Sequence, residues 1–232
     1  MSSVTRPWLN VDAGELPDEP DELYALADVV NVACGGHAGD EASMRRVLAF
    51  CMQSTTRAGA HPSYPDRAGF GRKPVALSAD ALRASVAEQC GALASAARTL
   101  GDVPIRHAKL HGALYHAANA DLEAARASLR GVVEALGSEI TVIGPPRGAT
   151  LEAARELGLG YAREGFADRA TRADGSLVPR GERGAMIDDP LRAAARATAL
   201  ALGGEVDTIC VHGDGPNALA VARAVREALS FA

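Results

Sequence analysis

The chain has 232 residues, and its 24 Lys and Arg against 29 Asp and Glu give a formal net charge of -5 at pH 7. This length allows a sizeable core, and 47% hydrophobic with 23% charged residues is typical of a globular protein. The acidic balance excludes a basic surface for nucleic acid or an anionic membrane, so neither is expected as a partner.

A short apolar run, a polar cluster rich in Gly, His and Asp, and an Ala-rich amphipathic segment follow one another repeatedly along the chain. The apolar runs predict strands at 7–11, 28–33, 57–60, 105–109, 140–143, 159–162 and 207–211. The amphipathic segments predict helices at 20–27, 41–56, 79–99, 120–136, 148–157, 189–202 and 216–230. Asp40 and Ser78 are suitable N-caps, and Gly203 a suitable helix end.

Strands that alternate with helices predict a parallel sheet covered by helices, either an open doubly wound sheet or a closed β/α barrel. Polar clusters follow six of the seven predicted strands, rather than one or two of them. In a barrel, the carboxyl ends of all strands face one mouth, where these clusters would converge. We therefore expect one α/β domain over residues 1–232, a TIM-like β/α barrel of about seven strands.

The first ten residues, MSSVTRPWLN, contain no apolar core of a secretory signal. No uncharged run reaches the ~20 apolar residues of a membrane span. The four cysteines lie far apart and form no CxxC pair, so free thiols in a reducing cytoplasm are expected.

The first predicted strand ends in LNVDAGE, where period-2 alternation puts Asn10 and Asp12 on one side of the chain. The second ends in NVACGGHAGD, in which glycines surround His37 and Asp40 precedes a helix. Taken singly, each of these is explained equally well as a turn or cap residue. A Cys34 nucleophile beside His37 is less favoured than a buried structural thiol.

The third strand ends at His61, and the long connection that follows carries Asp66 and Arg72. Connections of this length are often lids or binding loops. The fourth strand region, HAKLHG, places Lys109 and His111 on the same side of an extended chain. A buried ammonium is costly unless it is paired or used. We expect Lys109 to hold a carboxylate or phosphate rather than act as a base, the alternative being a solvated edge lysine.

The sixth unit contains Asp168 and Arg169 in the segment that follows a predicted strand, and a turn is expected at Asp174. A surface ion pair is the alternative explanation for this charge pair. The seventh strand runs into VHGDGP, where His212 and Asp214 precede a helix whose free backbone amides could bind an anion. Four glycine-flanked histidines at strand ends jointly favour a functional site over satisfied core residues.

Several catalytic signatures are absent. GxSxG does not occur, which disfavours a serine hydrolase, and no GxGxxG follows the first strand. GFGRK lacks the spacing of a phosphate-binding P-loop. No HExxH motif occurs to support a metal site, so a protein-bound metal stays an open question.

In this order, six segments resemble the LamB/YcsF family: LNVDAGE, NVACGGHAGD, GAHPSYPD with GFGRK, HAKLHGALY, EGFADR with DGSLVPR, and ICVHGDGPNAL. The resemblance runs from about residue 8 to about residue 225. It implies a distorted β/α barrel related to that of polysaccharide deacetylases. It also implies opening of the lactam 5-oxoproline to L-glutamate, driven by ATP with Mg as its counter-ion, together with separate B and C subunits. A homo-oligomer is an open alternative.

The polar clusters and the resemblance together indicate a set of site residues, to which we assign roles as a hypothesis. Those expected to be catalytic are Asp12, His37, His61, Lys109, His111 and Asp168. Those expected to bind substrate or phosphate are Asn10, Glu15, Asn31, Asp40, Asp66, Arg72, Arg169, Arg180, His212 and Asp214. Asp12, with His37 or His61, would deprotonate the attacking water. Lys109 and Arg169 would hold the carboxylate or phosphoryl charge.

Four positions depart from the family pattern, and we expect them to alter pocket shape: Trp8, Gly36, Leu110 and Thr171. Two other functions stay open. One is a metal-dependent deacetylase or amidohydrolase acting alone on a small amide or carbohydrate derivative, with Asp12, His37 and His61 as ligands. The other is a scaffold that only docks further subunits.

Overall fold

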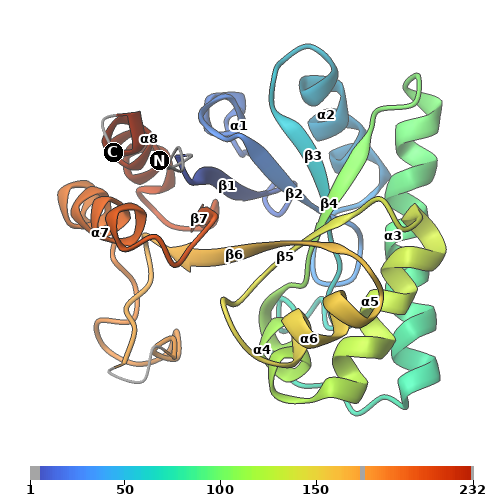
Figure 1. Cartoon of the computed structure of the whole chain (residues 1–232). Coiled ribbons are helices and arrows are strands. Elements are labelled where there is room, and N and C mark those ends of the chain that lie inside the picture. The colour runs from blue at the N-terminus through green and yellow to red at the C-terminus, as the bar shows by residue number, and fades with distance from the viewer. Residues whose placement is uncertain (1–5, 173–175, 231–232) are drawn as a thin grey trace, which may run out of the picture.

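The computed structural model describes residues 6–172 and 176–230 (Figure 1). Its seven parallel strands pair in chain order, and the last pairs with the first, which closes a barrel. The strands are β1 (Trp8–Ala13), β2 (Val29–Ala33), β3 (Arg57–His61), β4 (Ile105–Lys109), β5 (Thr141–Gly144), β6 (Gly160–Phe166) and β7 (Thr208–Val211). The expected seven-stranded α/β barrel is confirmed, while β6 continues past residue 162, where the prediction ended it.

Helices cover the outside of the barrel: α1 (Asp21–Leu26), α2 (Glu41–Met52), α3 (Ala79–Thr99), α4 (Gly112–Ala120), α5 (Leu122–Leu136), α6 (Ala149–Glu156), α7 (Pro190–Gly203) and α8 (Ala218–Ser230). In Figure 1, α7 and α8 lie side by side, across the barrel from α3 and α5. In the described part of the chain, no helix is both long and apolar enough to cross a membrane.

Most helix boundaries follow the expected capping residues. Asp40 accepts a hydrogen bond from the backbone amide of Ser43 at the start of α2, and Ser78 caps α3 in the same way. The sequence analysis missed α4, because extended Asp121 ends this helix and also caps α5, so two helices follow each other without a loop. α7 includes Gly203, and the left-handed residue is the next glycine. The turn expected at Asp174 lies outside the described residues.

Strand alternation separates an apolar outer face from a polar interior. On β1, Leu9 and Val11 are fully buried among the residues that pack against the helices. Fully burying one such side chain contributes about 1.5–3 kcal/mol. The intervening Trp8 and Asn10 point inward, where Trp8 packs edge-on against His107 and Asn10 bonds across to β7. Trp8 therefore occupies the amino-terminal end of the barrel interior. The charged side chains lie between it and the carboxyl ends of the strands.

The connection from β3 to α3 folds over the carboxyl end of the barrel and is held there by hydrogen bonds. The carboxylate of Asp66 accepts from the backbone amides of Gly69, at 2.9 Å, and Lys73, at 3.1 Å. The carbonyl of Gly71 accepts from the amide of Ala113 in α4 at 2.9 Å. This connection is thus tied to the start of α4, beside the barrel mouth.

Gly112 allows that close approach, and we predict that Gly112→Ala destabilises the fold. Its φ is +56°, and an added Cβ would lie 2.5 Å from the carbonyl oxygen of Gly71. We expect a loss of about 1–3 kcal/mol in the free energy of unfolding, measured by urea denaturation. Gly91→Ala in α3 is the matched control, because its Cβ meets nothing within 4 Å. That variant should be neutral or more stable by up to about 1 kcal/mol. Equal stabilities of the two variants would contradict this account.

Candidate active site

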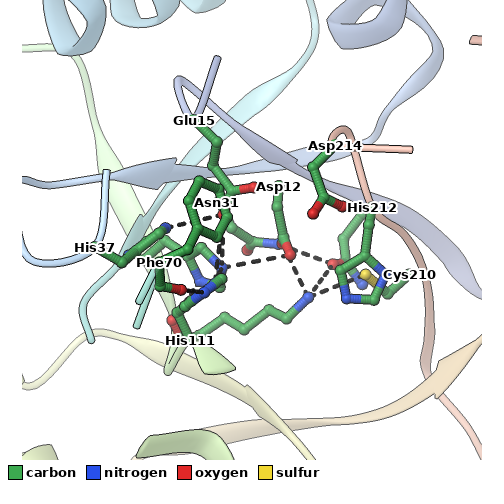
Figure 2. Close-up of polar contacts among 12 residues, drawn as sticks. Asp12, Glu15, Asn31, His37, Phe70, His111, Cys210, His212 and Asp214 are labelled. Carbon is green, nitrogen blue, oxygen red and sulfur yellow. Dashed lines mark hydrogen bonds and ion pairs between the residues drawn. The ribbon is translucent and has the colours of Figure 1, made fainter. Parts of the chain in front are cut away.

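The polar clusters that follow the strands meet at one mouth of the barrel, around a cavity of about 520 Å³. This volume is in the range of small-molecule sites. The titratable side chains that line it are Asp12, His61, Arg72, Lys109, His111, Tyr115, His116, Arg169, Arg180 and His212. Figure 2 shows the aspartates, histidines and Cys210 that surround it. The convergence expected from strand order is therefore present.

Lys109 lies at the floor of this cavity, enclosed by acids. Its ammonium is 2.9 Å from Asp12 Oδ1 and 3.0 Å from Glu164 Oε1, and its side chain is 3% exposed. It also lies 3.0 Å from the sulfur of Cys210. Burial opposes the charged form, but Asp12, Cys210 and Glu164 outweigh it and hold the pKa of Lys109 well above its usual value.

The role expected for Lys109, holding a substrate anion, does not fit this position. Two protein carboxylates already occupy the coordination directions of its ammonium. We therefore assign its charge to the protein's own acids, in particular to Asp12. Because Lys109 is buried and charged, removing it would leave those carboxylates unpaired.

A hydrogen-bonded pair of asparagines inside the barrel, Asn31 and Asn10, holds Asp12 in one orientation. The amide nitrogen of Asn31 donates to Asp12 Oδ1 at 3.0 Å and to Asn10 Oδ1 at 2.8 Å. Asn10 in turn donates to Thr208 Oγ1 at 2.9 Å. Burial tends to raise the pKa of Asp12, but His61 and Lys109 together lower it well below the usual range. Asp12 is thus an ionised carboxylate in a fixed orientation at the cavity floor.

Beside Asp12, three histidines and a glutamate form a compact cluster (Figure 2). His61 Nε2 lies 3.4 Å from Asp12 Oδ2 and 3.0 Å from His111 Nδ1. Glu15 Oε1 lies 2.9 Å from His37 Nε2 and 3.4 Å from His111 Nδ1. The rings of His37 and His111 stack with centroids 3.6 Å apart. We call Glu15, His37, His61 and His111 the histidine cluster.

Burial sets the charge states of this cluster. It lowers the pKa of His37 and, together with the nearby His61, that of His111, so both rings are neutral near pH 7. Burial, followed by the charge of Asp12, raises the pKa of Glu15 well above its usual value. Neutral imidazoles next to a carboxylate are groups that can take up a proton or bind a cation.

The opposite wall of the cavity is cationic. Arg169 is buried, and one of its terminal nitrogens donates to the carbonyl of Val178 at 2.7 Å. Its Nε finds no hydrogen-bond partner among the residues described. Arg180 and Arg72 both pair with Asp214, with Arg180 at 2.8 Å. Among the described residues, Arg169 is therefore the lining arginine whose charge no protein carboxylate pairs.

Asp168 and His212 form a buried pair between these two walls. Asp168 Oδ2 accepts from the backbone amide of His212 at 2.8 Å and lies 2.9 Å from His212 Nδ1. Burial opposes ionisation of Asp168, but His212 outweighs it and lowers the pKa of the carboxyl. The pair fixes the ring of His212, which lines the cavity.

Of the sixteen residues expected in the site, two lie elsewhere. Asp40 is exposed and caps α2, and Asp66 holds the β3–α3 connection. The others either line the cavity or contact a lining residue. Sequence reasoning omitted Glu164 and Tyr115 from the site. Glu164 was missed because the predicted strand stopped short of it, although its period-2 spacing from Phe166 would have placed both inside the barrel.

Three of the four departures from the family pattern lie away from the cavity lining. Trp8 packs in the lower barrel, and Thr171 accepts a hydrogen bond from Arg196 at 3.2 Å. A Cβ at Gly36 would lie 2.2 Å from the side-chain oxygen of Gln89, so Gln89 occupies the space of a larger residue there. Leu110 does line the cavity. The expected effect on pocket shape is therefore restricted to Leu110.

Comparison with known proteins agrees with this geometry. The sequence model of the LamB/YcsF family matches residues 9–232. The A subunit of the 5-oxoprolinase of Streptomyces coelicolor is 43% identical, over 97% of this chain and 96% of that protein. The protein of the same name from Methylococcus capsulatus is 41% identical, over 96% and 91%. A crystal structure of the lactam utilization protein of Thermus thermophilus aligns with a TM-score of 0.88 and 37% identity, over 98% and 97%.

We predict that Lys109→Met lowers the free energy of unfolding by about 3–5 kcal/mol, because it leaves the buried carboxylates of Asp12 and Glu164 without their cation. Denaturant unfolding followed by circular dichroism measures this. Adding Glu164→Gln to the variant should recover part of the loss. Arg126→Met, which breaks an exposed ion pair with Glu156, is the control and should leave stability nearly unchanged. A Lys109 variant as stable as the control would exclude a structural role for this ion pair.

Proposed function

Because the chain belongs to the LamB/YcsF family, we propose that it is the A subunit of a 5-oxoprolinase, a hydrolase that acts on a cyclic amide. The reaction opens the lactam of 5-oxo-L-proline to L-glutamate and is coupled to hydrolysis of ATP. The names of the relatives and of the Thermus structure support this activity. The proposed coupling to ATP comes from the family resemblance and fits the chemistry of the lactam, which is a stable amide.

One structural observation carries the proposal. A single cavity has a fixed ionised acid at its floor and, in its wall, a buried arginine, Arg169, that pairs with no carboxylate of the described residues. The substrate 5-oxoproline has a matching pair of groups, a lactam that must be attacked and a carboxylate that must be held. An acid–base group and an anion site in one pocket are what such a reaction requires.

We assign the substrate carboxylate to Arg169. Its guanidinium lines the cavity, and a charge-assisted bond from it to a carboxylate oxygen is stronger than a neutral one. Arg180 and Arg72 add positive potential, although Asp214 balances part of it. With the carboxylate at the arginines, the lactam ring would lie toward Asp12 and His61.

Asp12 would accept a proton from the attacking water, and Lys109 would keep it ionised. A carboxylate whose pKa is lowered is a weak base, so it suits an electrophile that has been activated first. Transfer of a phosphoryl group from ATP to the lactam oxygen, with release of ADP, would provide that activation. Water then attacks the carbon, and the C–N bond breaks as the nitrogen takes a proton. A second water releases phosphate from the resulting acyl phosphate.

The nucleotide and the partners follow from the same reasoning. The sequence has no P-loop, so we propose that ATP, with Mg as its counter-ion, binds with the help of separate B and C subunits. The relatives are each named as one subunit of an enzyme, which supports an assembly of several chains. All four cysteines are buried free thiols, which fits a cytoplasmic location.

Glutamate release from 5-oxoproline tests the proposed function, with the chain alone and with its B and C partners, each with and without ATP. We expect glutamate only with ATP and both partners present. Glutamate from the chain alone without ATP would support a solitary amidohydrolase instead. No glutamate in any combination, with the same partners shown to be active beside the A chain of a related enzyme, would reject this substrate.

In the active assembly, we predict that Asp12→Asn lowers kcat by about 10²-fold or more, because the proton acceptor of the attacking water is lost. Asp80→Asn, which removes an exposed carboxylate from the first turn of α3, is the control and should retain full activity. Both variants are compared for assembly with the partners before kinetics. Near-normal kcat in the assembled Asp12 variant would exclude Asp12 as this acceptor, and a kcat lost only in that variant supports it.

A further inference from the structure

The histidine cluster has the geometry of a metal-ligand set. Glu15 Oε1, His61 Nε2 and His111 Nδ1 are separated by 3.0, 3.4 and 3.8 Å. Ligands at about 2.0–2.1 Å from a tetrahedral ion lie roughly 3.3–3.4 Å apart, so this triangle has the size that one bound ion needs. His37 Nε2 lies 2.9 Å from Glu15 Oε1, and all four ligand atoms are within 4.8 Å of one another.

The hydrogen bonds on the outer side of two rings fix their tautomers. His61 Nδ1 lies 2.8 Å from the carbonyl oxygen of Lys109, and His111 Nε2 lies 2.9 Å from that of Phe70. A carbonyl only accepts, so each of these nitrogens carries the proton and donates. When the rings are neutral, the lone pairs of the other two nitrogens face each other at 3.0 Å. Such lone pairs repel unless a cation lies between them.

This arrangement is the one found around metal-binding histidines, whose second nitrogen typically donates to a backbone carbonyl and so orients the ring. A shared proton would also separate the two lone pairs. However, a proton bridges only two nitrogens, whereas here four potential ligands converge. The surrounding charge also favours a cation, because two buried carboxylates, Asp12 and Glu164, lie beside one ammonium, Lys109, and Glu15 adds a third buried acid.

We propose that Glu15, His37, His61 and His111 form a binding site for a divalent transition-metal ion, with Zn²⁺ as the best match. Three imidazoles and one carboxylate suit zinc or a neighbouring first-row metal, whereas Mg²⁺ and Ca²⁺ prefer oxygen ligands. His61 and His111 line the cavity, so an ion can enter from there. The site shares His37 and His61 with the metal ligands considered for the deacetylase alternative. Asp12, the third of those ligands, instead contacts Lys109 and Asn31.

The proposal does not rest on the proposed function, and metal binding by the full-length chain tests it. The purified chain is stripped with a chelator and titrated with ZnCl₂ and separately with CoCl₂. We expect one ion per chain, a visible absorption band of four-coordinate Co²⁺, and a Tm that rises with zinc concentration. A folded wild-type chain that shows no bound ion and no cobalt band at millimolar metal would overturn the proposal.

Two conservative variants locate the ion. His61→Gln and His111→Asn keep polar side chains of similar reach, and each should weaken Zn²⁺ binding by about 100-fold or more, since removing even an outer partner of a ligand costs 10–100-fold. His116→Gln is the matched control, because His116 lines the same cavity outside the cluster. It should bind zinc like the wild type. If one cluster variant does not fold, Glu15→Gln takes its place. Wild-type affinity in the folded cluster variants, or a loss confined to His116→Gln, would contradict the assignment.

Discussion

The ion pairs of Lys109 with Asp12 and Glu164 are the interaction on which the rest of the site depends. They bring β4, β1 and β6 together across the barrel interior, where an apolar core would otherwise be expected. Each charge would be costly alone, and together they compensate one another. Because Lys109 neutralises part of this charge, Asp12 can stay ionised at the bottom of a largely buried cavity.

Around this floor, the barrel separates two kinds of chemistry. The histidine cluster lies on the β1–β4 side, at or just beyond the carboxyl ends of these strands. The arginines come from the long connections after β3 and β6. A small anionic amide that binds between them would have its carboxylate at the arginines and its scissile bond at the acid. The rigid strands thus hold the reacting groups, and the longer loops supply the contacts that select the substrate.

The sequence was sufficient for the architecture for local reasons, whereas most of the candidate site residues came from the family resemblance. Seven strand–helix units predicted the barrel, and strand parity placed Asn10 and Asp12 on its inner side. It was less informative where distant residues decide the outcome. The contact of Glu15 with His111, and the enclosure of Lys109 by two acids, join residues far apart in the chain. No local pattern shows such distances, so Lys109 was expected to face the substrate and Glu164 was overlooked.

The central claim is that one cavity holds the carboxylate of 5-oxoproline at Arg169 and its lactam at Asp12. The most direct test is the KM for 5-oxoproline of Arg169→Gln in the active assembly, beside the surface control Arg126→Gln. We expect a KM at least about tenfold higher for Arg169→Gln alone, since a hydrogen bond to a charged group contributes about 1.5–3 kcal/mol. An unchanged KM in the assembled variant would show that the carboxylate binds elsewhere.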